Sequence, residues 1–87
     1  MKIFYEIYNK LKFPDLKKLE EHLNQPYNFV CQEFLKFEDC FTYFNCIEET
    51  SPNTDVSNLF IVKLKINKKE IKIERAFYNL KKYQALL

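Results

Sequence analysis

The sequence predicts a single α+β domain over residues 1–87, with a small antiparallel sheet of three to four strands and two or three helices packed on it. Two patterns support this prediction. Apolar and polar residues alternate between positions 60 and 75, as in a β-hairpin. Leucines recur every three or four residues between positions 14 and 24, as on one face of a helix. The chain has 87 residues, of which 47% are hydrophobic, and this suits one small domain.

The N-terminal part predicts a strand followed by a helix. In residues 2–8, large apolar side chains fall on both alternating faces of an extended chain, which is typical of a strand. Residues 14–24 predict a helix, because Pro14 is tolerated in a first turn and Asp15 favours the positive end of the helix dipole. We expect a leucine stripe on this helix to face the sheet: Leu16, Leu19 and Leu23.

Residues 27–49 combine two conflicting signals. Large apolar side chains recur there at the helical spacings of three and four, namely Tyr27, Val30, Phe34, Phe37, Phe41 and Phe44. The composition, however, is aromatic and typical of strands. We expect a helix at 27–39 followed by a strand at 41–48. The alternative is a pair of strands that turns at Glu38 and Asp39. The polar residues 50–58 predict a loop.

The alternation at 60–75 also predicts a strand register. A two-residue turn at Lys68 and Lys69 would place Ile66 opposite Ile71, Leu64 opposite Ile73, and Lys63 opposite Glu74. Because two lysines suit such a tight turn poorly, a longer loop at 67–70 is the alternative. One face of this hairpin would be core, and the other, which includes Ile61, would be solvated. Residues 76–87 predict a closing helix.

The composition narrows the chemistry. The chain contains no glycine, which excludes phosphate-binding P-loops and dinucleotide fingerprints. It has three cysteines, Cys31, Cys40 and Cys46, without close pairs, so we expect free, mostly buried thiols, no metal and no cofactor. Neither a signal peptide nor an apolar segment of about 18 residues is found, so we expect a cytoplasmic protein without membrane contact.

Nothing in the sequence assembles a catalytic group of residues. Nucleophilic catalysis needs a nucleophile, a base and a group that orients the base. The single histidine, His22, falls on the outer flank of the first predicted helix, which favours a surface role. Some small nucleases use Lys, Arg and Tyr without histidine, and Lys72, Arg75 and Tyr78 are near one another in sequence. Nothing in their spacing requires that function, so we expect no enzymatic activity.

A net charge of +2 hides an acidic middle and a basic end of the chain. Residues 28–62 hold one lysine against six acidic residues, and residues 63–87 hold eight basic residues against two acidic ones. The acidic segment predicts a surface for a basic protein, with Tyr43 or Phe29 as aromatic anchors. Its residues are Glu33, Glu38, Asp39, Tyr43, Glu48, Glu49 and Asp55. The basic segment predicts a nucleic-acid surface formed by Lys63, Lys65, Lys68, Lys69, Lys72 and Arg75.

Together these features predict a small non-catalytic protein-binding domain that acts as a stoichiometric inhibitor. Immunity proteins that neutralise nuclease toxins, and phage anti-defence proteins, are the classes that its size and composition suit by analogy. The expected partner is a basic protein such as a toxin or a defence nuclease. The alternative is a small nucleic-acid-binding protein that uses the basic hairpin at 60–75.

Overall fold

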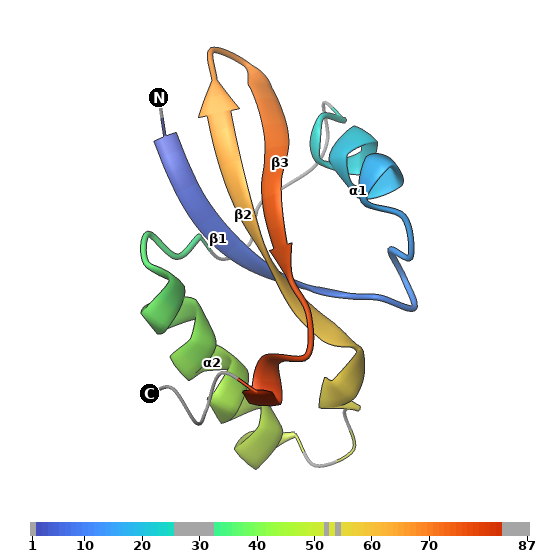
Figure 1. Ribbon diagram of the computed structural model, residues 1–87, viewed down its shortest axis with the longest axis vertical. Helices are drawn as coiled ribbons and strands as arrows, with labels where there is room; N and C mark the ends of the chain where they lie inside the picture. Colours follow the sequence, from blue (N-terminus) through green and yellow to red (C-terminus); the bar gives the residue numbers. More distant parts are fainter. Residues whose placement is uncertain (1, 26–32, 52, 54, 83–87) are drawn as a thin grey trace.

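The computed structural model of this chain describes residues 2–25, 33–51, 53 and 55–82. In chain order its elements are β1 (Lys2–Asn9), α1 (Leu16–Leu23), α2 (Phe37–Thr50), the short 3-10 helix η1 (Val56–Asn58), β2 (Leu59–Asn67) and β3 (Glu70–Phe77). The three strands form one antiparallel sheet in the order β1-β2-β3 (Figure 1). The predicted α+β class is therefore confirmed, with three strands and two α-helices.

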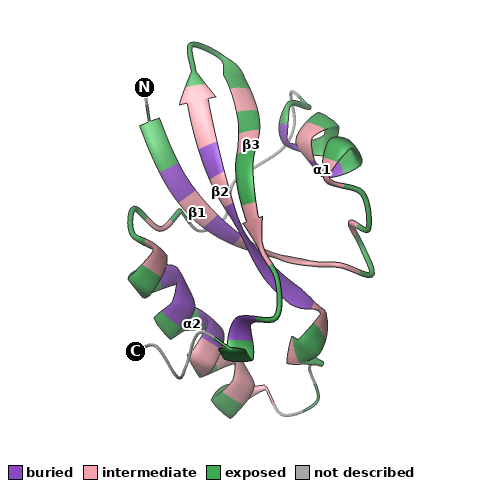
Figure 2. Ribbon diagram, viewed as in Figure 1, coloured by how far each residue is buried: buried purple, intermediate pink, exposed green. Residues whose placement is uncertain are grey.

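The two helices cover opposite faces of the sheet, which is the middle layer of the fold. On one face, α1 packs Leu19 and Leu23 against a cluster that includes Phe4 and Val62. On the other face, α2 packs Phe41 and Phe44 against a cluster that includes Ile61. Residues 59–62 of β2 are buried because their side chains alternate between the two cores (Figure 2). The prediction of a solvated hairpin face is therefore wrong at Ile61, which is fully buried on the α2 side.

The first strand and helix follow the sequence pattern closely. β1 extends from Lys2 to Asn9, and α1 begins directly after Asp15. Asp15 is the N-cap of this helix, and its carboxylate accepts a hydrogen bond from the Lys17 backbone N–H at 2.9 Å. Pro14 therefore precedes the cap instead of occupying the first helical position.

The predicted strand at 41–48 is wrong, and the predicted helix at 27–39 is wrong over residues 33–36 and right over 37–39. A single helix, α2, extends over Phe37–Thr50, and the stripe of Phe37, Phe41 and Phe44 continues along its inner face. The strand pair turning at Glu38 and Asp39 is also wrong, since both residues lie in the first turn of α2. Before this helix, Phe34 makes an isolated backbone bridge to Tyr5 of β1, with N–O distances of 2.7 and 3.1 Å. The part of the predicted helix at 27–32 lies outside the described residues.

The β2–β3 hairpin confirms the predicted turn but not the whole register. Lys68 and Lys69 form the turn, and Lys68 adopts a positive φ of 59°. Ile66 pairs with Ile71 and Leu64 with Ile73, as predicted. The register then shifts at a β-bulge, so that Lys63 lies opposite Arg75 and not opposite Glu74.

The predicted closing helix at 76–87 is wrong in its first half. Ala76 and Phe77 finish β3, because they pair with Val62 and Ile61 of the central strand. Residues 80–82 form one 3-10 turn, which buries Leu80 against the cluster under α2. Residues 83–87 lie outside the described part of the chain.

Candidate binding surfaces

The exposed side of α2 forms a continuous surface, which we call the α2 surface. It consists of Glu38, Asp39, Thr42, Tyr43, Cys46 and Glu49, which are all exposed. Helical periodicity places them opposite the buried Phe41 and Phe44. From Glu38 to Glu49 this surface spans about 16 Å, at ~1.5 Å per residue. Phe37–Thr50 contains four acidic residues and no lysine or arginine.

Apolar side chains border the first half of the α2 surface. Tyr43 is 37% exposed, and its ring lies 5.5 Å from the ring of Phe34, between centroids. Leu35, two residues before the helix, is 69% exposed. Exposed aromatic side chains are typical of the centre of a protein interface, and polar and charged residues are typical of its rim.

The acidic residues of α2 differ in the interactions that stabilise their negative charge. Glu38 and Asp39 lie in the first turn, where the helix dipole stabilises negative charge. Glu48 and Glu49 lie at the opposite end, where the dipole disfavours negative charge and no basic residue is present in the last turn. Glu48 is paired with Lys81 at 3.2 Å. Among the residues that the structure describes, no ion pair to Glu49 is observed.

Besides Glu48, two further predicted acidic residues are not part of this surface. Glu33 forms an ion pair with Lys2 at the start of β1. Asp55 caps η1, and hydrogen bonds from the Ser57 hydroxyl and backbone N–H hold the pKa of its carboxyl below the usual value. The structure thus brings together Glu38, Asp39, Tyr43 and Glu49. The other predicted anchor, Phe29, lies outside the described residues.

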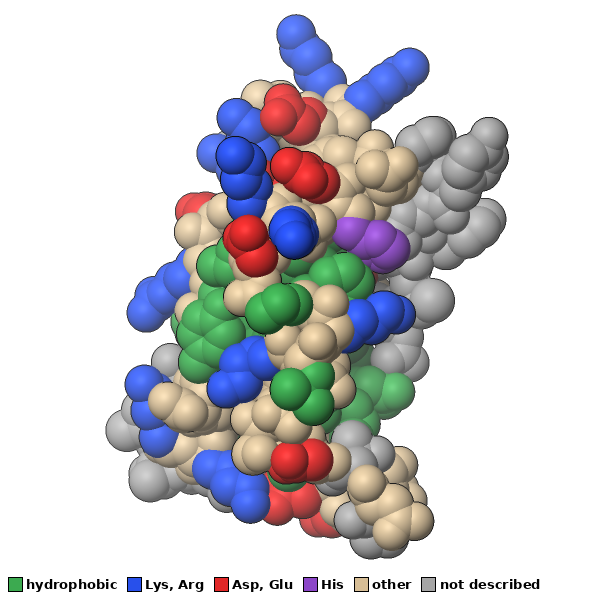
Figure 3. Space-filling view, turned by 90° about the vertical axis from the view of Figure 1, so that its right-hand side faces the viewer, with side chains coloured by type: hydrophobic (Ala, Val, Ile, Leu, Met, Phe, Trp, Pro, Cys, Tyr) green, Lys and Arg blue, Asp and Glu red, His purple; other side chains and the backbone are tan. Residues whose placement is uncertain are grey.

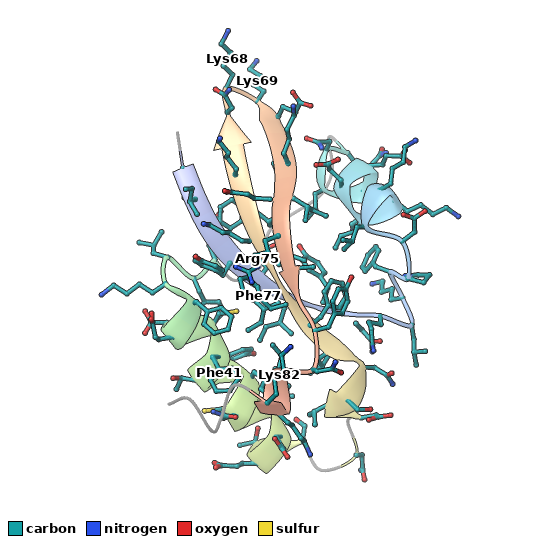
Figure 4. The ribbon with its side chains drawn as sticks, in the orientation of Figure 1. Phe41, Lys68, Lys69, Arg75, Phe77 and Lys82 are labelled. Atoms are coloured by element: carbon teal, nitrogen blue, oxygen red, sulfur yellow. The ribbon has the colours of Figure 1, made fainter. Side chains whose placement is uncertain are left out.

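The basic residues of the hairpin lie on the α2 side of the sheet and at the hairpin tip. Four cations form what we call the cationic face, in two neighbouring cross-strand pairs: Lys65 with Lys72, and Lys63 with Arg75. Lys68 and Lys69 project from the tip (Figure 4). The structure therefore places all six predicted basic residues on one hairpin.

Possible catalytic residues do not come together. His22 is exposed on α1, with its ring 5.0 Å from that of Phe13. Tyr78 stacks on Phe60 of the α1-side core, whereas Arg75 lies over Phe77 of the α2-side core, so these two side chains contact opposite faces of the sheet. Within the described ranges, no group of three His, Cys, Asp or Glu residues is placed to hold a metal ion.

The two described cysteines are free and lie in different surroundings. Cys40 is fully buried, and burial raises the pKa of its thiol to about 12, with a further contribution from Glu6. Cys46 is exposed on the α2 surface. Both thiols are free, as predicted, but the expected burial is wrong at Cys46, and Cys31 lies outside the described residues.

The sequence did not single out Glu6, a buried carboxyl group on β1. It is 4% exposed and accepts a hydrogen bond from the Tyr8 hydroxyl. Burial raises the pKa of Glu6 to about 7, the bond from Tyr8 opposes this rise, and nearby Glu33 adds to it. The sequence feature that could have identified this buried carboxyl is its position between Phe4 and Tyr8, where it interrupts an otherwise apolar face of the strand.

A mixed apolar and basic patch was also missed. It lies on the side shown in Figure 3, where hydrophobic side chains gather at mid-height among lysines. Leu11 is 76% exposed on a turn that Asn9 fixes by accepting the Leu11 N–H at 2.8 Å. The Lys10 ammonium lies 6.0 Å from the centroid of the Tyr78 ring. A separate open hollow of about 970 Å³ between α1 and the hairpin tip is lined by lysines, glutamates and amide side chains of both elements.

None of the described helices is long and apolar enough to cross a membrane. No protein-family model matches the sequence, and comparisons with curated proteins and with solved structures found no significant match.

Proposed function

We propose that this chain is a non-catalytic inhibitor that binds a basic protein through the α2 surface. The observation that carries the proposal is Glu49 beside Glu48 in the last turn of α2, where negative charge opposes the helix dipole. Folding alone gives no reason for the Glu49 charge, because no ion pair to it is observed among the described residues. A basic partner would supply the missing counter-charge.

The neighbouring side chains support an interface of this kind. Tyr43 and Leu35 offer apolar contact area, and tyrosine is enriched among the residues that dominate binding energy. Glu38 and Asp39 lie beside them and would pair with lysine or arginine on the partner. Such complementarity accelerates association and discriminates against acidic proteins.

The α2 surface is presented on a rigid support. Phe41 and Phe44 are each 1% exposed and pack into the cluster that contains Ile61 of the central strand. A helix anchored in this way loses little conformational entropy on binding, which favours affinity. An inhibitor needs no reactive group, since it acts by covering the partner's own site. Immunity proteins and phage anti-defence proteins are the inhibitor classes that we propose for it.

Glu49→Lys is the most informative variant. It removes an acid for which the described residues show no ion pair and places a cation where the dipole favours one, so we expect folding stability to be equal or higher by about 0.3–1 kcal/mol. Binding should nevertheless weaken by about tenfold or more, which corresponds to about 1.4 kcal/mol. Lower affinity without lower stability separates a binding role from a folding role.

Glu21→Lys is the matched control, because Glu21 is an exposed residue in the last turn of α1, on the other side of the sheet. Proteins captured by the immobilised chain would be identified, and their affinities for the native chain and both variants measured by calorimetry. The proposal predicts a basic partner, one-to-one stoichiometry and an affinity loss for Glu49→Lys alone. Equal losses for both variants, or an acidic partner, would overturn it.

A further inference from the structure

The bulge in β3 changes which charges meet across the hairpin. With regular pairing from the turn at Lys68, Lys63 would face Glu74, a complementary pair. The extra residue leaves Glu74 out of register and places Arg75 opposite Lys63. Ile73 and Ala76 both pack on the α1 side although they are three residues apart, which shows that the bulge reverses the alternation of side chains. Arg75 is thereby turned onto the face that carries Lys63.

The resulting cationic face has two like-charge pairs next to each other. Lys65 lies opposite Lys72, and Lys63 lies opposite Arg75. Like charges directly opposite each other destabilise a sheet. The four cations occupy two rows about 6.8 Å apart along the strands, on neighbouring strands about 4.8 Å apart. Glu74 partly offsets this repulsion, since its carboxylate lies 3.9 Å from the Lys63 ammonium, but its side chain is 45% exposed.

The arginine on this face is held in place before any ligand arrives. The guanidinium carbon of Arg75 lies 4.7 Å from the centroid of the Phe77 ring (Figure 4). Phe77 in turn packs on Phe37, with ring centroids 4.9 Å apart. The cation is therefore ordered by an aromatic support that belongs to the α2-side core. A pre-organised guanidinium suits recognition of phosphate oxygens.

We propose that the cationic face and the hairpin tip bind the phosphate backbone of duplex nucleic acid. The cations continue to the tip through Lys68 and Lys69 (Figure 4). Because β1 pairs with β2 as far as Ile66, the cationic face belongs to a three-stranded sheet, and we expect it to lie on the phosphate backbone instead of inside a groove. The aromatic rings of this face are engaged within the protein, Phe77 with Arg75 and Tyr5 with Phe37. Base stacking, which single strands require, is therefore poorly served, and a duplex is favoured.

This inference does not depend on the α2 surface, because it uses other residues and the opposite charge. The binding is expected to be tolerant of sequence, since contacts to phosphate carry no base information. It is also expected to weaken steeply as salt concentration rises.

The test is fluorescence anisotropy with a short DNA duplex, a single strand of the same length and heparin as a polyanion without bases. The variant is Lys65→Gln with Lys72→Gln, which removes one like-charge pair and should leave the unfolding temperature equal or higher. If both lysines contact phosphates, the slope of log K against log salt for the duplex should become shallower by about 1.8. Lys17→Gln with Lys18→Gln on α1 is the control with the same change in charge.

The proposal predicts tighter binding of the duplex than of the single strand or heparin, and a change of slope in the hairpin variant alone. It is overturned by absent duplex binding at about 50 mM salt, by equal binding of heparin, or by equal effects of the two variants. A preference for the single strand would likewise overturn the choice of a duplex. Glu49→Lys separates this proposal from the preceding one, because it should not weaken duplex binding.

Discussion

The side chain of Asn24 pairs with the backbone of Ile71 as a neighbouring strand would. The Ile71 N–H donates to Asn24 Oδ1 at 2.9 Å, and Asn24 Nδ2 donates to the Ile71 carbonyl at 2.9 Å. One turn earlier in α1, Glu20 accepts a hydrogen bond from the Ile73 N–H at 2.8 Å. The end of α1 therefore occupies the outer edge of β3, and Phe34 bonds to Tyr5 at the outer edge of β1. Both edges are thus partly protected from pairing with other chains.

Asn24→Ala should destabilise the fold by about 1 kcal/mol, because each lost hydrogen bond contributes about 0.5–1.5 kcal/mol and this site is partly solvated. Urea unfolding measures the change. Gln25→Ala is the control, since Gln25 is the next residue and is also exposed. If both variants lose the same stability, the Asn24 side chain does not hold the sheet edge. Self-association of Asn24→Ala, measured by sedimentation, would show that the edge is then open.

Glu6 should make stability depend on pH. The pKa of its carboxyl rises from 4.5 to about 7 in the folded chain, so the folded state binds the proton more tightly than the unfolded state. The corresponding stabilisation is complete below pH 4.5, is lost as pH rises towards 7, and changes little at higher pH. Glu6→Gln should remove this fall from the unfolding free energy, measured in urea at a series of pH values. Glu21→Gln should retain the fall in unfolding free energy between pH 4.5 and 7. If the unfolding free energy of Glu6→Gln still falls with pH as it does in the native chain, Glu6 is not the group responsible.

Alanine substitutions in α2 test the helix that replaces the predicted strand at 41–48. Phe41 and Phe44 are both buried, so Phe41→Ala and Phe44→Ala should each cost about 3–5 kcal/mol of unfolding free energy. Tyr43→Ala should cost much less, because Tyr43 is 37% exposed. In a strand, positions 41 and 44 would lie on opposite faces and need not be equally sensitive. A large loss at 41 or 44 but not at both would contradict the helix.

The parts of the fold that the sequence predicted are those with a clean local period. β1, α1 and the turn at Lys68 and Lys69 were all placed by alternation or by a leucine stripe. The stripe through Phe37, Phe41 and Phe44 was also visible, but aromatic composition favoured a strand after residue 39. The helix start gave no help, since its N-cap, Lys36, makes no side-chain capping bond. Burial against Ile61 therefore decided the structure of this segment over local propensity.

The candidate surfaces were predicted less completely, for physical reasons. Charge counting found the acidic and basic segments, but ion pairs and caps removed Glu33, Glu48 and Asp55 from the set of uncommitted charges. The bulge that turns Arg75 towards Lys63 has no glycine or proline to mark it. It depends on how β3 fits along the central strand, where Ala76 and Phe77 pair with Val62 and Ile61. That fit is a property of the assembled sheet and not of any short segment.

The strand order also constrains how the molecule forms on the ribosome. Among the described elements β1 is synthesised before the others, whereas β2, its partner in the sheet, begins at Leu59, after α1 and α2. The β2–β3 hairpin is local, whereas pairing of β1 requires closure of a loop of nearly fifty residues. The emerging chain must therefore hold both apolar faces of β1 without their partner strand until β2 has been synthesised. During that interval Phe4 and Tyr5 are exposed to chaperones and to other nascent chains.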